Sequence, residues 1–260
     1  MRASTTNNKK MKERKFDWLL VLGLWLIVWS LISLRVSAFY LPSPLETGKA
    51  LFALFLLKET YIIIVMSLFR VLAGLILAIF LGVTTGLLAG VSTGVYKFLQ
   101  PILVAIKSTP VVSFIILAMI YMNKAYVPSF CGMLLCYPII YYNVIEGYRT
   151  VDSELINMSK VYNVPMKRQL LRLYIPSMAP YIFAGILTSI GIGWKGTIAA
   201  EVISVLQTSI GNEIYSGKIY LDTEAVFSWT IIIIICSLAI EKTTKKLILK
   251  NNYYERFKVI

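Results

Sequence analysis

Residues 67–90, SLFRVLAGLILAIFLGVTTGLLAG, decide the fold class of this chain. Arg70 is the only charged residue in the stretch, and the 20 residues after it are apolar or small apart from two threonines. A run of this length crosses the hydrocarbon core of a bilayer as a helix, because a helix satisfies its backbone hydrogen bonds internally. We therefore expect a membrane-spanning helix here.

The composition of the whole chain supports the same class. Of its 260 residues, 58% are apolar and 15% charged, and the mean hydropathy is +0.74. Soluble domains have about 45–50% apolar and about 25% charged residues. The chain has no histidine, the commonest general base and metal ligand. Its three cysteines lie in apolar runs without metal-ligand spacing, so we interpret them as packing residues. These features exclude a soluble enzyme.

Six apolar blocks predict six membrane-spanning helices and an all-α membrane protein. The blocks cover approximately residues 18–34, 60–89, 104–122, 128–147, 178–200 and 225–240. The first block is longer than the apolar core of a signal peptide, so we interpret it as an uncleaved span. The expected organisation is a basic N-terminus (1–16), a first transmembrane helix (17–35), a core with five transmembrane helices (55–241) and a basic tail (242–260).

The basic residues are distributed as expected for a protein with both termini in the cytoplasm. With the N-terminus inside, nineteen of the 26 lysines and arginines fall in inner segments and five in outer segments. We therefore attribute the net charge of +13 to membrane topology, with some attraction to anionic lipid, and not to nucleic-acid binding.

Four glycines, Gly82, Gly86, Gly90 and Gly94, recur every four residues and so share one face of a helix. Such a stripe lets a neighbouring helix approach closely in lipid. Two interpretations stay open: tight packing within one bundle, or packing that also slides during a transport cycle.

The longest inner segment, residues 148–176, predicts a short helix at about residues 152–164. Asp152 is a good N-cap, Glu154 suits the positive helix N-terminus, and Asn163 and Pro165 end the helix. Apolar residues recur on one side at helical spacing. The helix either lies on lipid or serves as a peg that fits a groove on a cytosolic partner.

Several stretches, taken together and in order, carry a family resemblance. They are residues 67–90, residues 191–204 (GIGWKGTIAAEVIS) and residues 209–229 (SIGNEIYSGKIYLDTEAVFSW). With them the chain resembles, over roughly residues 55–245, the permease subunits of bacterial ABC importers, in the branch similar to nitrate, sulfonate and taurine permeases.

The family's cytoplasmic loop carries Glu-Ala-Ala, a glycine four residues later and then Leu-Pro. At these positions this chain has Asn157, Met158 and Ser159, then Asn163, then Ile175 and Pro176. Asparagine tolerates the left-handed backbone that glycine would adopt, so the turn is expected to survive. The missing acidic residue removes a charge that would contact the ATPase.

The resemblance implies a type I, binding-protein-dependent importer with a cytoplasmic coupling helix, in a bacterial cell membrane. Its partners would be a second permease subunit, expected as a homodimer, a dimer of cytosolic ATPase subunits and an external substrate-binding protein. The implied coupling residues are Glu154, Asn157, Met158, Ser159, Asn163 and Pro176. The chain has no Gly-x-x-x-x-Gly-Lys-Ser/Thr segment, so we expect no bound cofactor and no catalytic residue here, with ATP held by the partner.

Four residues are candidates for the translocation pathway: Arg70, Trp194, Lys195 and Glu201. A charge in the middle of a span costs about 2.5–3.5 kcal/mol, so such residues usually face a cavity or a partner. Arg70 either serves the pathway or pairs with a carbonyl or carboxylate inside the bundle. Glu201 lies six residues after Lys195 on one helix, on a different face, so this pair would need another helix or subunit.

Trp194 and Lys195 stand among three glycines, Gly191, Gly193 and Gly196, where we expect a thinly covered backbone. The ammonium and indole would then steer a small anion through the pore. Alternatively, Lys195 snorkels to the outer headgroups and Trp194 belongs to the interfacial aromatic belt.

Two other classes compete with a permease. An ion-coupled secondary carrier needs intramembrane carboxylates, and the spans offer few beyond Glu146 and Glu201 near their ends. A membrane enzyme needs a nucleophile with its base or a metal constellation, which the sequence lacks. The sequence does not name the solute, because the resembling branch spans nitrate, sulfonates, taurine, bicarbonate and precursors of thiamine. Lys195 favours an anion.

Overall fold

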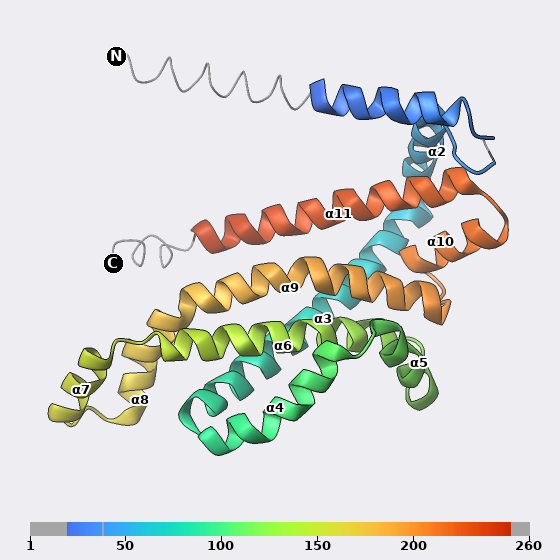
Figure 1. The fold of residues 1–260 in the computed structure, drawn as a ribbon. Helices are drawn as coiled ribbons and strands as arrows, with labels where there is room; N and C mark the ends of the chain where they lie inside the picture. Colours follow the sequence, from blue (N-terminus) through green and yellow to red (C-terminus); the bar gives the residue numbers. More distant parts are fainter. Residues whose placement is uncertain (1–19, 38, 251–260) are drawn as a thin grey trace, which may run out of the picture. The chain divides into compact units, whose positions relative to one another are not determined.

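The computed structural model describes residues 20–37 and 39–250, which form helices and contain no strand (Figure 1). The helices in chain order are Leu20–Ser33, α2 (Pro44–Leu56), α3 (Lys58–Val91), α4 (Thr93–Ser108), α5 (Val111–Tyr121), α6 (Val127–Arg149), α7 (Ser153–Val161), α8 (Met166–Gln169), the π-helical turn η1 (Leu170–Tyr174), α9 (Ile175–Ser204), α10 (Ile210–Ile219) and α11 (Thr223–Lys250). The predicted N-terminus, the start of the first span and the end of the tail lie outside the described residues.

Four of the described helices are long and apolar enough to cross a membrane. They are Lys58–Val91, Val127–Arg149, Met166–Ser204 and Thr223–Lys246, and they match four of the six predicted blocks. The described part of the first predicted span is the shorter apolar helix Leu20–Ser33. The all-α class and the membrane-spanning character are confirmed.

The third predicted block, 104–122, is not one straight helix. It is divided between α4 and α5, which meet at an angle of 106°. The break falls at Thr109 and Pro110, because a residue before proline is disfavoured in the helical conformation. α4 also begins at Thr93, so residues 93–103, which lie between two of the predicted blocks, are helical.

The chain divides into two compact units. One contains the described residues up to Thr60 together with Glu213–Ile231, and the other contains Tyr61–Asn212 and the described residues from Ile232 onward. In the second unit α6 and α9 lie side by side (Figure 1). Glycines bring the two helices together, because a Cβ at Gly193 would lie 2.5 Å from the Cys136 sulfur.

The glycine stripe of α3 packs against α6. A Cβ at Gly82, Gly86 or Gly90 would lie 2.7–2.8 Å from side-chain atoms of α6. The atoms belong to Ile140, Val144 and Tyr148, which also recur every four residues. The predicted close approach is therefore confirmed for three of the four glycines. Gly94 is the exception: it lies in the first turn of α4 and contacts no neighbouring helix.

The first unit has its own contacts. Trp29 stacks on Phe227 of α11 with ring centroids 5.8 Å apart, and its indole N–H donates to the Pro42 carbonyl at 3.0 Å. The hydroxyl of Ser228 donates to the carbonyl of Thr47 at 3.3 Å, which joins α11 to α2.

α2 is a helix that our sequence analysis missed. Ser43 and Glu46 form a capping box, in which the Glu46 carboxylate accepts from the Ser43 N–H at 2.8 Å and Pro44 occupies the first turn. The Ser-x-x-Glu pattern with proline at the helix start was the signal that could have found it.

Candidate functional site

α7 begins where the sequence predicted. The carboxylate of Asp152 accepts a hydrogen bond from the Glu154 N–H at 2.8 Å, which satisfies one of the free donors of the first turn. Glu154 is exposed in that first turn, where a negative charge interacts favourably with the helix dipole. The short helix therefore has a fixed N-terminus of its own.

The C-terminus of α7 is a Schellman motif, the double hydrogen-bonded turn in which helices often end. Asn163 has a left-handed backbone with φ of 49°. Its N–H donates to the Lys160 carbonyl at 3.0 Å, and the Val164 N–H donates to the Ser159 carbonyl at 2.9 Å. This geometry confirms that asparagine can occupy the position where the resembling family has glycine.

The apolar side of α7 is exposed. Met158 is 57% and Tyr162 72% exposed, and Leu155 and Val161 are exposed as well. Only Ile156, on another side, packs against the core of the unit. Asn157 is exposed, and Ser159 is half-buried with its hydroxyl donating to the Ile156 carbonyl at 2.7 Å. α7 thus offers apolar surface that the described residues do not cover.

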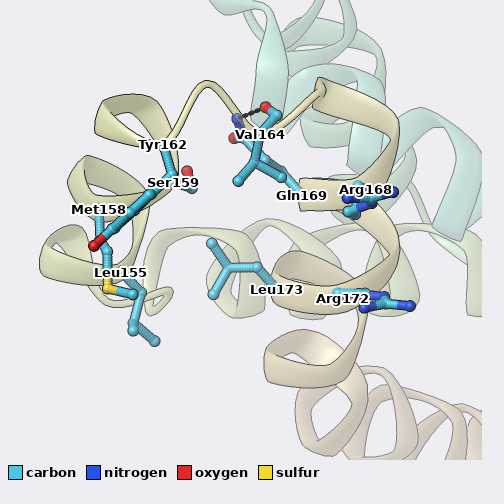
Figure 2. A pocket seen from close by; sticks show the side chains of 9 residues that line it. All are labelled: Leu155, Met158, Ser159, Tyr162, Val164, Arg168, Gln169, Arg172 and Leu173. Carbon is cyan, nitrogen blue, oxygen red and sulfur yellow. Dashed lines mark hydrogen bonds between the residues drawn. The ribbon is translucent and has the colours of Figure 1, made fainter.

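A groove of about 430 Å³ separates α7 from α8 and η1 (Figure 2). It is lined by Leu155, Met158, Ser159, Tyr162, Val164, Arg168, Gln169, Arg172 and Leu173. The Gln169 amide donates to the Val164 carbonyl at 2.7 Å and so holds the connection between the two walls. This groove was not expected from the sequence, because it requires two helices that fold back on each other.

The second wall joins α9 through a wide helical turn. Pro176 lacks an N–H, and its ring would clash with the carbonyl of Arg172 in a regular helix. The π-helical turn η1 directly precedes it, and such turns accommodate an interrupted hydrogen-bond ladder. Tyr174 of η1 stacks on Tyr148 of α6 with ring centroids 4.8 Å apart, so the junction is fixed to α6.

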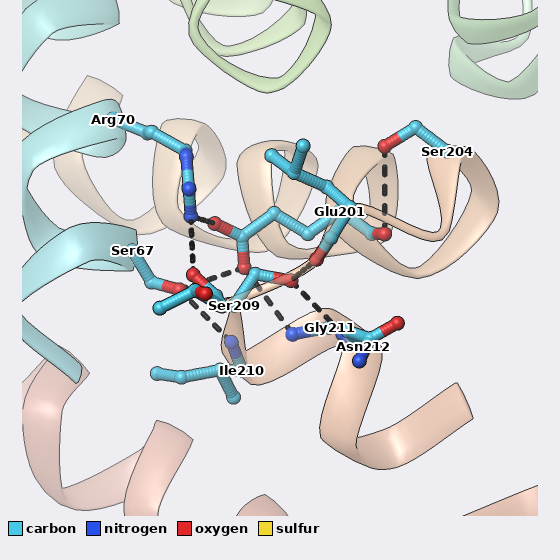
Figure 3. A network of polar contacts seen from close by, with 10 residues as sticks. Ser67, Arg70, Glu201, Ser204, Ser209, Ile210, Gly211 and Asn212 are labelled. Carbon is cyan, nitrogen blue, oxygen red and sulfur yellow. Dashed lines mark hydrogen bonds and ion pairs between the residues drawn. The ribbon is translucent and has the colours of Figure 1, made fainter. Parts of the chain in front are cut away.

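A buried ion pair lies at the other end of α9 (Figure 3). A guanidinium nitrogen of Arg70 is 3.0 Å from the Glu201 carboxylate, whose side chain is 0% exposed, while that of Arg70 is 15% exposed. The other carboxylate oxygen accepts from the Ser67 hydroxyl at 2.8 Å and from the Gly211 N–H at 3.2 Å. Arg70 thus pairs with a carboxylate inside the bundle, which is one of the two interpretations that the sequence left open.

Further hydrogen bonds join the ion pair to the turn between α9 and α10. Arg70 also donates to the Thr208 carbonyl at 3.1 Å, and the Ile210 N–H donates to the Ser67 hydroxyl at 3.0 Å. Thr208 has a left-handed φ of 53°, and Gly211 approaches Glu201 so closely that a Cβ would overlap it. The network therefore holds an irregular turn against α3.

Trp194 and Lys195 are placed differently from each other. Trp194 is 1% exposed, and its indole N–H has no hydrogen-bond partner among the residues described. Lys195 is exposed. The expectation of a thinly covered backbone is wrong for Gly193 and Gly196, which are buried against Cys136 and Leu135 of α6. An aromatic-belt position for Trp194 is wrong too, because the bundle covers its ring.

The two sites are separated by about the thickness of a membrane. From Ile175 to Glu201 the helix rises about 39 Å at 1.5 Å per residue, and the hydrocarbon core of a bilayer is about 30 Å thick. The described residues contain no group of three His, Cys, Asp or Glu side chains that could hold a metal ion. The structure therefore has an exposed, mainly apolar groove near the N-terminus of α9 and a buried ion pair near its C-terminus.

Comparisons with known proteins agree with this architecture. Residues 74–241 match the family described as binding-protein-dependent transport system inner membrane component. A protein of Bacillus subtilis (strain 168) named as the aliphatic sulfonates transport permease protein SsuC is 26% identical over 86% of this chain and 83% of its own length. The nitrate import permease protein NrtB of Synechococcus elongatus is 24% identical over 78% of this chain and 76% of its own.

A third relative and a solved structure extend the comparison. The bicarbonate transport system permease protein CmpB of Synechocystis sp. is 28% identical over 53% of this chain and 49% of its own length. In the crystal structure of an amino acid ABC transporter with histidines, a chain superposes with a TM-score of 0.55, at 16% identity, over 74% of this chain and 92% of that chain. The likeness at this identity shows the fold. Since the family match covers more than half of its length, this chain belongs to the binding-protein-dependent transport system inner membrane components and is the membrane-embedded permease subunit of an ABC importer.

Proposed function

We propose that this permease imports a small inorganic or organic anion, which an external binding protein delivers and a cytosolic ATPase drives inward. The relatives named above are permeases for sulfonates, nitrate and bicarbonate, all of which are anions. The exposed Lys195 on α9 is the residue of this chain that would attract such a solute. Trp194, the preceding residue of α9, is buried and packs inside the bundle.

The ATPase docks on α7. The observation that carries this proposal is a helix capped at both ends within the chain, whose apolar side the described residues leave uncovered. In this arrangement Glu154 fixes the first turn, Met158 and Asn157 face the ATPase, and Asn163 turns the chain toward α8. The remaining proposed coupling residues, Ser159 and Pro176, shape the turn at the end of α7 and the junction with α9.

The proposed orientation places α7 and both termini in the cytoplasm. The excess of lysine and arginine in the corresponding segments supports it. The Arg70–Glu201 pair, about one membrane thickness away along α9, then lies toward the external face. Two permease subunits, expected to be identical, would bind two ATPase subunits and enclose the pathway between them.

The docking proposal is tested by replacing residues 154–164 with a flexible Gly-Ser segment and co-expressing the chain with its ATPase partner. We expect the variant to insert into the membrane and to lose co-purification of the ATPase. The matched control is an equally long Gly-Ser replacement within 242–260, which should retain the ATPase. Retained ATPase on the α7 variant would overturn the docking site.

The transport proposal is tested by uptake of labelled sulfonate, nitrate and bicarbonate at matched expression. Uptake should require ATP and the binding protein, and Lys195→Ala should reduce it. Uptake that survives ATP depletion but collapses with the ion gradient would instead support a secondary carrier. Unchanged uptake for both Lys195→Ala and Glu201→Ala would remove these residues from the pathway.

A further inference from the structure

The groove between α7 and α8 is lined mainly by apolar side chains. Leu173 and Val164 are half-buried at its base, and Leu155, Met158 and the ring of Tyr162 form the α7 wall (Figure 2). The Schellman motif and the Gln169–Val164 hydrogen bond fix the connection between the two walls. The groove is therefore closed at one end by hydrogen bonds between residues that follow α7 and residues of α8.

The charged residues that line this groove are both basic and both lie on the wall formed by α8 and η1. Arg168 and Arg172 line it from α8 and η1, and in Figure 2 their guanidinium groups end on the side away from α7. Neither forms an ion pair with a carboxylate in the part of the chain that the structure describes. The nearest acidic residues along the chain, Asp152 and Glu154, are at the opposite end of α7. Asn157, on α7 itself, contributes no charge.

We propose that the groove receives an apolar side chain of the ATPase, and that carboxylates next to that side chain pair with Arg168 and Arg172. The inference rests on the proposed docking at α7 and adds the chemistry of the partner surface. A concave apolar site with cations along one edge complements a convex protein element with an apolar tip and acidic neighbours.

In this proposal the partner binds in one orientation. The apolar side chain enters between Met158 and Leu173, and the acidic residues of the ATPase lie beyond α8, on the η1 side. Insertion is thus mutual, because α7 contacts the ATPase while an ATPase side chain enters the permease. Movement of that side chain would act on η1, and through it on α9.

The first test places a photo-crosslinking amino acid, p-benzoylphenylalanine, at Met158 in the assembled complex of permease and ATPase in lipid nanodiscs. We expect crosslinking to an ATPase peptide that contains an apolar residue flanked by Asp or Glu. Crosslinking to lipid in place of the ATPase, or to an ATPase peptide without acidic residues, would overturn the proposal.

The second test reverses the charges with Arg168→Glu and Arg172→Glu together. We expect the ATPase to bind at least tenfold more weakly, which corresponds to about 1.4 kcal/mol, because like charges would then face each other. The matched control is Lys242→Glu with Lys245→Glu, which makes the same charge change at two exposed lysines of α11 that do not line the groove. Changing the crosslinked acidic residues of the ATPase to lysine should restore binding to the Arg168/Arg172 variant.

These outcomes separate this inference from the docking proposal. If the Gly-Ser replacement of α7 releases the ATPase but reversal at Arg168 and Arg172 has no more effect than the control, docking stands and the acidic partner surface is wrong. If neither change releases the ATPase, both proposals fail. Wild-type binding should also weaken between about 0.1 and 1 M salt, over which the Debye length falls from about 10 to 3 Å.

Discussion

Breaking the Arg70–Glu201 pair should strongly destabilise the second unit. The Glu201 carboxylate accepts from Arg70, Ser67 and the Gly211 N–H. Glu201→Gln supplies one acceptor oxygen and an NH₂ group that can only donate, so at least one of these donors loses its acceptor. Arg70→Met leaves a buried carboxylate without its counter-charge. Removing one partner of a buried pair costs about 3–5 kcal/mol.

The measurement is a double-mutant cycle of thermal unfolding in nanodiscs, with Arg70→Met, Glu201→Met and the combined variant. At about 2–4 °C per kcal/mol for a chain of this size, each single change should lower Tm by about 6–20 °C. The combined variant should lose less than the sum of the two, because no charge is then left unpaired. Lys195→Met, an exposed position on the same helix, is the control and should stay within about 0.5 kcal/mol.

Additive losses in the cycle, or a Tm change below about 2 °C for either single variant, would refute the reasoning. Additivity would mean that Arg70 and Glu201 act independently and that the 3.0 Å contact contributes nothing to stability. The turn between α9 and α10 would then be held in place only by the hydrogen bonds of Ser67 and Gly211.

Three further outcomes follow from local geometry. Gly86→Ala should destabilise the chain by about 1–3 kcal/mol because its Cβ would lie 2.8 Å from a side chain of α6, whereas Gly191→Ala, with no atom within 4 Å, should be neutral or stabilising in thermal unfolding. Asn163→Val should cost about 1–2 kcal/mol through the left-handed backbone, and Asn163→Gly should keep full ATPase binding. Backbone and side-chain hydrogen bonds from Ser43 lower the pKa of Glu46, so the capping box contributes fully above the ordinary pKa and is lost as pH falls through the lowered one. Ser43→Ala removes the hydroxyl but keeps the backbone N–H, which is the larger cause, so carbon-13 NMR of the carboxylate should show that pKa rising only part of the way to its ordinary value.

The features that could be predicted from sequence are those determined by neighbouring residues. Asp152 and Asn163 define the ends of α7 because capping and left-handed turns involve only a few adjacent residues. Long apolar runs located the spans for the same reason. Pro110 indicated that a helix could be interrupted at this point. The angle of 106° between α4 and α5 depends on how the two helices pack, which the local sequence does not determine.

The features that could not be predicted depend on residues far apart in the chain. The Arg70–Glu201 pair joins residues 131 positions apart, and periodicity only showed that Lys195 was not a suitable partner within the same helix. The groove beside α7 likewise needs a second wall from α8 and η1. The sequence analysis expected Trp194 to face either the lipid or the pore. In the structure it is buried, because neighbouring helices pack against it.

The packing of α3, α6 and α9 bears on whether the glycine stripe slides during transport. Ile140 and Val144 each fit over a glycine of α3, and both rows repeat every four residues, or about 6 Å along the helices. A smaller slide would bring larger residues such as Val83 against Ile140, and close-packed interiors resist such overlap by about 1–3 kcal/mol per site. α6 and α9 are joined in the same way by the contact of Gly193 with Cys136. We therefore expect that force applied at α7 moves these three helices together, and that any rearrangement during transport takes place at surfaces outside this glycine-packed set.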